Sequence, residues 1–195
     1  MIEFETYMNK IGSRKKLYHN ISKAFNVKIA LYPGSHIDIT PSFYISNLIY
    51  VDSFKGTKKF FSHKDDIMLY VNKNKIYDYD PLIQYIHSDY YNELEIPKVD
   101  LIISMYAGFV SLATKKYLKM HGIILANDSH ADATLLNHDP NFELIAVVNN
   151  SVISSRALST FFQSKKVVDI NIVKSQMKPP KYIKIADQYI FRKVK

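Results

Sequence analysis

The chain of 195 residues contains no cysteine. A protein without cysteine has no disulfide bond, no thiolate ligand for a metal ion and no cysteine nucleophile. Its apolar runs are all shorter than the roughly 20 residues that span a bilayer. The N-terminal sequence MIEFETYMNK also lacks the apolar core of a secretory signal peptide. We therefore expect a cytoplasmic protein that has no membrane partner.

What the chain does contain is enough apolar material for one core, since 47% of its residues are hydrophobic. Short apolar runs predict seven strands, at residues 29–32, 48–51, 82–86, 99–105, 123–126, 142–148 and 188–194. Helical segments are predicted between them, at residues 7–26, 64–73, 111–120, 131–138 and near 155–164, with Gly122 closing the third. This alternation predicts an α/β fold, a Rossmann-like doubly wound sheet of seven mostly parallel strands with helices on both faces.

The segment from Lys28 to Asp52 carries the most informative pattern. An apolar run ends in the turn Pro33-Gly34-Ser35, and a second apolar run ends at Asp52, 18 residues after Gly34. A glycine turn lets backbone N–H groups approach a ligand, and an acid about 20 residues later can accept hydrogen bonds from the two hydroxyls of a ribose. The spacing therefore predicts a site for an adenosine-containing ligand.

Positive charge is concentrated near the C-terminal end. Residues 156–195, called the basic segment below, contain ten Lys and Arg and only two Asp, whereas acidic and basic residues balance in the rest of the chain. Such a segment can attract the phosphates of nucleic acid or of anionic metabolites. The alternative is an ordinary lysine-rich surface in contact with solvent.

Taken together, these features resemble the class I S-adenosylmethionine-dependent methyltransferases. The resemblance rests on the glycine turn at Gly34, on Asp52, on Asp89 after the third strand, and on the runs 100–106 and 118–125, which are similar to the fourth and fifth strands of that family. Residues 135–148 resemble a divergent bacterial branch of the superfamily.

The resemblance implies S-adenosylmethionine as the cofactor. In that family the acid after the second strand holds the ribose hydroxyls, and a polar residue after the third strand lies beside the adenine amino group. Carried over to this sequence, the implied cofactor-binding residues are Tyr32, Pro33, Gly34, Ser35, Asp52, Ser53, Asp89, Tyr90, Ser104 and Met105.

Candidate catalytic residues follow the fourth and fifth strands. Tyr106 lies at the mouth of the presumed central strand, where a substrate would bind. Asp128, His130 and Asp132 alternate along the chain, as an acid/base or metal cluster does on an extended backbone. A helix is predicted to begin here, so helix capping is favoured over metal binding and no metal site is predicted. The catalytic candidates are therefore Tyr106, His130 and Asp128.

We expect a single domain over residues 1–195. It divides into an N-terminal helical segment (1–26), a nucleotide-binding core (27–148), an insertion that shapes substrate access (149–187) and the last strand (188–195). The sequence does not fix the oligomeric state.

Three functions remain open from the sequence. The first is methyl transfer to a small-molecule acceptor, which the sequence does not identify. The second is methylation of RNA or DNA through the basic segment. The third is a catalytically inactive member of the fold that binds a nucleotide or a partner. Only one glycine is present in the turn, and the family's amino-methylating motif is replaced by Ser104-Met105-Tyr106-Ala107-Gly108. These departures favour the third function.

Overall fold

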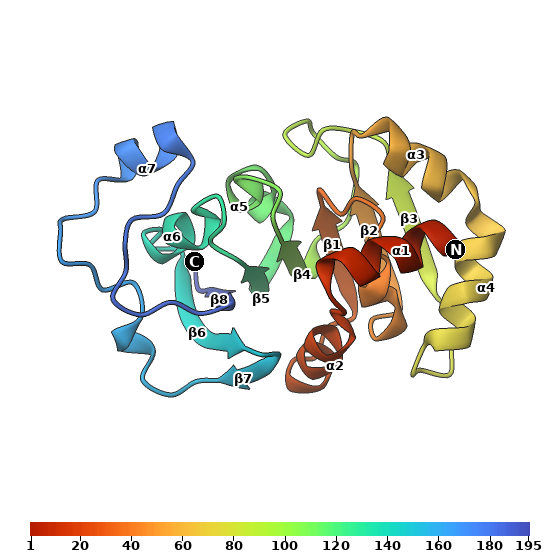
Figure 1. Ribbon diagram of the computed structural model, residues 1–195, viewed down its shortest axis with the longest axis horizontal. Helices are drawn as coiled ribbons and strands as arrows, with labels where there is room; N and C mark the ends of the chain where they lie inside the picture. Colours follow the sequence, from red (N-terminus) through yellow and green to blue (C-terminus); the bar gives the residue numbers. More distant parts are fainter.

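Eight strands form a single sheet in the computed structural model, which describes all residues 1–195 (Figure 1). Their order across the sheet is β3-β2-β1-β4-β5-β8-β6-β7. Strands β1 to β5 pair in parallel, and β8 runs antiparallel to both of its neighbours. The strands are β1 (Ile29–Pro33), β2 (Asn47–Val51), β3 (Leu82–Ile86), β4 (Val99–Ser104), β5 (Leu118–Ala126), β6 (Phe142–Asn149), β7 (Val152–Ser154) and β8 (Gln188–Lys193).

Helices cover both faces of this sheet. The helices and 3-10 turns are α1 (Ile2–Ile11), α2 (Lys15–Ala24), η1 (Thr40–Phe43), α3 (Lys55–Ser62), α4 (Lys64–Asn74), α5 (Val110–Thr114), η2 (Lys115–Tyr117), α6 (Asp132–Asn137), η3 (Leu158–Thr160) and α7 (Ile170–Gln176). Helices α1 to α4 pack on one face, and α5 and α6 pack on the other. The predicted fold class is therefore confirmed, although the sheet has eight strands where seven were predicted.

The alternation of side chains along the central strands explains the two layers. In β1, Ala30 and Tyr32 face the helices α1 to α4, whereas Leu31 faces α5 and α6. In β4, Leu101 and Ile102 divide between the same two layers. Successive side chains of a strand point to opposite faces, so strands that are buried on both faces must be apolar throughout. Each face therefore has its own apolar core.

The helix predicted at residues 111–120 is wrong in its second half. Only Val110 to Tyr117 is helical, and β5 begins at Leu118, five residues before the predicted start of this strand. Gly122 is buried inside β5 and does not cap a helix, while His121 carries the left-handed backbone angle (φ 63°). The apolar residues 117, 118 and 120 fit helical spacing, but the chain from Leu118 onward pairs with β4 and is therefore a strand.

Three other elements differ from the prediction. The single helix predicted over residues 7–26 is two helices, α1 and α2, separated at Gly12, whose φ of 84° no helix can contain. Helix α3 was not predicted. The helix predicted near residues 155–164 is only the short turn η3, and the helix of this region is α7.

The eighth strand lies in the segment between β6 and β8. Strand β7 pairs antiparallel with β6 through the tight turn Asn150-Ser151, both of whose residues have positive φ. From β7 the chain runs through η3 and α7, at the left-hand end of the molecule in Figure 1, before it returns as β8. None of the helices has the length and apolar character that a bilayer crossing needs.

The sheet order changes direction between β1 and β4, which lie side by side. At such a point the connections from the two strands leave toward opposite faces, and a crevice opens beyond their carboxyl ends. The end of β6 and the start of β8 lie beside the carboxyl end of β5, because β6 runs in the same direction as β5 and β8 runs against both. This edge is where a ligand site is expected.

Candidate functional site

The glycine turn after β1 is built so that only glycine fits. Gly34 has a φ of 62°, and its N–H donates to the carbonyl of Val51 at 2.7 Å. A Cβ atom at this position would lie 2.3 Å from the Cβ of Ala107, in the loop after β4. The left-handed backbone disfavours a side chain, and the close approach of this loop excludes one. Gly34 therefore lets the loops after β1 and β4 meet at the crevice.

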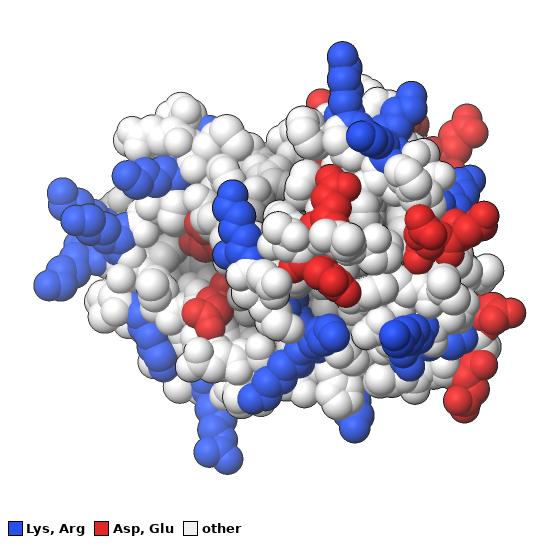
Figure 2. Space-filling view, turned by 45° about the vertical axis from the view of Figure 1, so that its right-hand side comes forward, with Lys and Arg blue, Asp and Glu red and all other residues white.

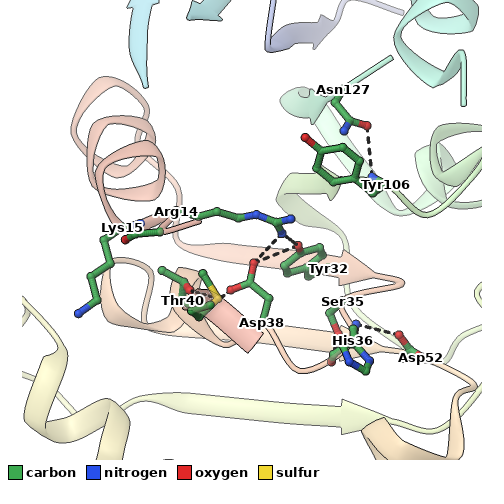
Figure 3. Close-up of polar contacts among 12 residues, drawn as sticks. Arg14, Lys15, Tyr32, Ser35, His36, Asp38, Thr40, Asp52, Tyr106 and Asn127 are labelled. Atoms are coloured by element: carbon green, nitrogen blue, oxygen red, sulfur yellow. Dashed lines mark hydrogen bonds and ion pairs between the residues drawn. The ribbon is translucent and has the colours of Figure 1, made fainter. Parts of the chain in front are cut away.

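Asp52 lies at the end of β2 and holds two loops by its carboxylate. One oxygen accepts the N–H of His36 at 2.8 Å (Figure 3). The other accepts the N–H of Phe54 at 2.8 Å. Each carboxylate oxygen has a second lone pair. The carboxylate is thus fixed in position and retains capacity to accept hydrogen bonds from a ligand.

The remaining residues around this turn have mainly local partners. The Ser35 hydroxyl, which is buried, donates to the carbonyl of His36. Asp89 is exposed, and its carboxylate accepts the N–H of Tyr91 at 2.9 Å. The hydroxyl of Tyr90 donates to the carbonyl of Ala107, and burial raises the pKa of Tyr90 to about 12. Tyr90 therefore fastens the loop after β4 over the glycine turn, a role that the sequence did not predict.

A buried charged cluster lies on the other side of β1. The guanidinium of Arg14 donates to the hydroxyl of Tyr32 at 2.9 Å and to Asp38 at 2.8 Å (Figure 3). Tyr32 also donates to Asp38 at 3.2 Å, and the other oxygen of Asp38 accepts the N–H of Thr40 at 3.0 Å. Burial raises the pKa of Tyr32 well above its usual value, so it remains a neutral hydroxyl. Sequence reasoning missed Arg14 because nothing local marks a pair that is 24 residues apart.

Tyr106 follows the end of β4, as predicted, and lines a cleft. It has a φ of 61° and is 56% exposed, and its N–H donates to the side-chain oxygen of Asn127 at 3.2 Å. The guanidinium carbon of Arg14 lies 5.4 Å from the centre of its ring, within cation–π distance. The cleft has a volume of about 380 Å³ and is lined by Tyr7, Ile11, Arg14, Leu17, Met105, Tyr106, Asn150, Ser151, Asp187 and Gln188.

Ser104, predicted to bind the cofactor, is used inside the protein. Its hydroxyl donates to the carboxylate of Asp132 at 2.5 Å, and Ser111 donates to the same carboxylate from its N–H and its hydroxyl. Burial raises the pKa of Asp132 in spite of these bonds. The network joins the end of β4 to the starts of α5 and α6, so its main effect is to hold the crevice edge rigid.

Asp128 carries a carboxyl group near the crevice whose pKa is raised. Burial raises its pKa to about 6, while hydrogen bonds from the N–H and the hydroxyl of Thr134, each at 2.8 Å, act in the opposite direction. The charge of Asp132 raises it further. A carboxyl group with a pKa near neutrality can exchange a proton with a substrate. The bond from the N–H of Thr134 also satisfies a donor in the first turn of α6, although the N-cap residue of this helix is Ala131 and not Asp128.

The side chains of His130 and Asp132, which alternate along the sequence, have separate local partners. A ring nitrogen of His130 lies 3.0 Å from the hydroxyl of Ser129. Asp132 points into its network with Ser104 and Ser111, and no group of three or more acidic or histidine side chains is arranged to hold a metal ion. A second cleft, of about 250 Å³, is lined by Tyr106, Asn127, Asp128, Ser129, Pro179, Pro180, Tyr182, Ile185, Ala186, Asp187 and Tyr189.

Comparison with solved structures identifies the fold. No protein-family model and no curated protein matches the sequence. Among solved structures, a methyltransferase from Geobacter sulfurreducens is similar with a TM-score of 0.53 at 11% identity, over 75% of this chain and 81% of that one. Cofactor-bound Rv0187 from MTB has a TM-score of 0.52 at 8% identity, over 93% and 79%. The N-methyltransferase NodS from Bradyrhizobium japonicum, in complex with S-adenosylhomocysteine, has a TM-score of 0.50 at 10% identity, over 93% and 86%.

These similarities, together with the strand order, define the fold as that of class I S-adenosylmethionine-dependent methyltransferases. The predicted resemblance to this superfamily is therefore confirmed at the level of the fold. At identities of 8–11%, the similarity concerns the fold alone.

Proposed function

We propose that this protein binds S-adenosylmethionine beyond the carboxyl ends of β1, β2 and β4, and transfers its methyl group to a small-molecule acceptor. The observation that carries the proposal is the fixed carboxylate of Asp52, held by His36 and Phe54 beside the Gly34 turn at the point where the sheet order changes direction. Two free acceptor positions at the end of β2 suit the two hydroxyls of a ribose. The likeness to methyltransferase structures, one of them with S-adenosylhomocysteine bound, supports the assignment.

The residues around the Gly34 turn would hold this cofactor in separable roles. Asp52 would accept the ribose hydroxyls, and the Gly34 turn would let the backbone approach the ligand, with Ser53, Asp89 and Tyr90 around the adenosine. The cofactor supplies an activated methyl group on a sulfonium. Tyr106, with its exposed aromatic face, would favour the cationic donor over the neutral product.

Transfer requires the acceptor to lie in line with the bond from sulfur to methyl. The new bond joins the acceptor nucleophile to the methyl carbon, and the electron pair of the broken bond stays on sulfur. An acceptor that starts protonated must lose one proton. Asp128, whose pKa is raised to about 6 and which lines the same cleft as Tyr106, would receive it. His130 is the second candidate for this proton.

The test is calorimetric binding of S-adenosylhomocysteine to the wild-type chain and to Asp52→Ala. Loss of charge-assisted hydrogen bonds to the ribose should weaken binding by about tenfold or more. Because Asp52 also holds His36 and Phe54, the Asp52→Asn variant is included, since its remaining oxygen keeps one of these bonds. The exposed Asp66→Ala in α4 serves as the control and should bind as wild type does. Equal affinity of Asp52→Ala and wild type would remove Asp52 from the site.

A second candidate is a ligand-binding protein of this fold that does not catalyse transfer. The specific observation in its favour is the close contact between Gly34 and Ala107, where Tyr90 fastens the loop after β4 directly over the turn. Binding of S-adenosylhomocysteine without detectable methylation of any nucleophile would support it. Absence of binding would contradict both candidates.

The basic segment supports a third candidate, methylation of RNA or DNA. Figure 2 shows Lys and Arg side chains around the left-hand end of the molecule, the end that Figure 1 assigns to α7 and its flanking loops. Nucleic acid would be attracted to this end by charge alone, without sequence preference.

A further inference from the structure

The two clefts beside Tyr106 continue into a third. The clefts of about 380 and 250 Å³ share Tyr106 and Asp187. The second of these and a third, of about 790 Å³, share Pro179, Pro180 and Tyr182. Clefts that share lining residues lie next to one another, so these three form a row, called the trough below, that reaches from the proposed site of methyl transfer to residues 164–183 of the basic segment.

The far end of this trough, called the basic groove below, combines an apolar lining with positive charge. Its apolar lining includes Val168 and Val173, which are partly or fully buried, and the exposed Ile172 and Ile183. Four lysines line it as well: Lys165, Lys166, Lys178 and Lys181.

The charge of these lysines is not compensated within the protein. The four ion pairs of the structure involve Arg14, Lys115, Lys116 and Lys119, none of which lies in the groove. Asp169 is the only acidic residue of the lining, and one of its oxygens already accepts the N–H groups of Asn171 and Ile172 at the start of α7. Unpaired lysines that surround an apolar surface suit a ligand that has an anionic group and an apolar part.

We propose that the basic groove binds the anionic end of the methyl acceptor, an elongated molecule with a phosphate or carboxylate at one end and an apolar body that follows the trough toward Tyr106. This inference rests on the proposed function, because it assigns the other end of the same molecule to the site of transfer. The acceptor's nucleophile then lies beside Asp128, far from the charge that anchors the molecule.

The lining distinguishes this ligand from nucleic acid. Proteins that hold single strands stack bases on exposed aromatic side chains. The basic groove has one aromatic residue, Tyr182, whose ring packs edge-on against Phe162 at 5.1 Å and whose hydroxyl lies 3.1 Å from that of Thr134. The side chains that remain available, Ile172, Ile183 and the fully exposed Val167, are aliphatic.

Decyl phosphate is a suitable probe, because it carries one phosphate and an unbranched apolar body. Its binding to the full chain is measured by calorimetry below its micelle concentration. In the groove variant, the four groove lysines are replaced by Gln (Lys165→Gln, Lys166→Gln, Lys178→Gln and Lys181→Gln). The matched control replaces four exposed lysines of α3 and α4 (Lys55→Gln, Lys58→Gln, Lys59→Gln and Lys64→Gln), which changes the net charge equally.

Wild type and control should bind decyl phosphate with affinities within about twofold of each other, and the groove variant should bind about tenfold more weakly or worse. Inorganic phosphate should bind far more weakly than decyl phosphate, since it leaves the apolar lining uncovered. Three results would overturn the inference: no binding of decyl phosphate to wild type, equal loss in the groove variant and the control, or inorganic phosphate binding as tightly as decyl phosphate.

Binding of S-adenosylhomocysteine to the same three proteins separates this inference from the proposed function. All three should bind it equally, because the proposed cofactor site contains none of the substituted lysines. If S-adenosylhomocysteine binds and decyl phosphate does not, the acceptor inference fails and the proposed function stands. If the groove variant alone loses decyl phosphate while no protein binds S-adenosylhomocysteine, the proposed function fails and the groove is an anion site of another kind, which overturns its role as an acceptor site.

Discussion

The raised pKa of Asp128 makes the stability of the folded protein depend on pH. Its pKa rises from 3.8 to about 6 on folding, so the folded protein holds this proton more tightly than the unfolded chain does. The resulting stabilisation is complete below pH ~3.8 and is lost as the pH rises to about 6, at a cost of about 2–3 kcal/mol.

The neutral Asp128→Asn variant should escape this loss. The quantity to compare is the free energy of unfolding of the variant minus that of wild type. This difference should be more positive at pH ~7.5 than at pH ~4 by about 2–3 kcal/mol, as measured by urea denaturation at the two pH values. The exposed Asp65→Asn in α4 serves as the control substitution. An identical difference between Asp128→Asn and wild type at both pH values would contradict a raised pKa in the folded state.

Several site residues could be predicted from the sequence because their signal is local. Gly34 and Asp52 were found by a turn signature and a spacing, and the structure places both at the crevice edge. Ser104 lies in the fourth strand, as the sequence predicted. Its hydrogen bond to Asp132, 28 residues away, could not be predicted, because no local pattern marks it. The roles of Arg14 and Tyr90 also depend on partners distant in sequence, so they emerge only when the sheet assembles.

At the scale of elements, the Arg14 cluster decides how α1 and α2 sit on β1. Asp38 is fully buried, and its carboxylate depends on Arg14 for its charge partner. Replacing one partner of a buried ion pair leaves an uncompensated charge, so Arg14→Met should lower the free energy of unfolding by about 3–5 kcal/mol. The double variant Arg14→Met/Asp38→Asn should recover part of this loss, because a neutral amide still accepts the N–H of Thr40.

Lys119→Met is the matched control, since its pair with Asp100 is partly exposed to solvent and should contribute less than about 1 kcal/mol. Urea denaturation of the four proteins gives the comparison. Equal stability of Arg14→Met and wild type would mean that the cluster does not hold these helices.

At the scale of elements, most strands were predicted well. The runs of β1, β2, β3, β4, β6 and β8 were each placed within one residue, because pairing and patterning agree there. The helix expected over residues 111–120 failed because pairing of Leu118 with Val99 in β4 overrides helical spacing. Strand β7 is three residues long and carries no periodicity that a sequence could reveal.

At the scale of the whole molecule, the uneven charge leads to a test of the nucleic-acid alternative. We expect a fluorescent single-stranded RNA of about 20 nucleotides to show no binding at physiological salt, because Asp128 and Asp187 line the path from the basic groove to Tyr106 and repel phosphates. Fluorescence anisotropy over a salt series measures this. Tight binding whose log–log salt slope becomes shallower in the groove variant, by roughly 0.7 per lost phosphate contact, would favour a nucleic-acid acceptor instead.

One hydrogen bond joins α2 to a part of the chain that is synthesised much later. The side-chain amide of Asn20, in α2, donates to the carbonyl of Ser151 in the turn before β7, at 2.7 Å and across 131 residues of chain. During synthesis from the N-terminus, α2 therefore emerges long before its last contact exists, and its buried side chains Leu17 and Ile21 stay without their full packing until residue 151 has followed. Contacts between distant parts of a chain form slowly. We therefore expect the cleft beside Tyr106, whose lining includes residues of α1 and α2, to be among the last parts of the molecule to form.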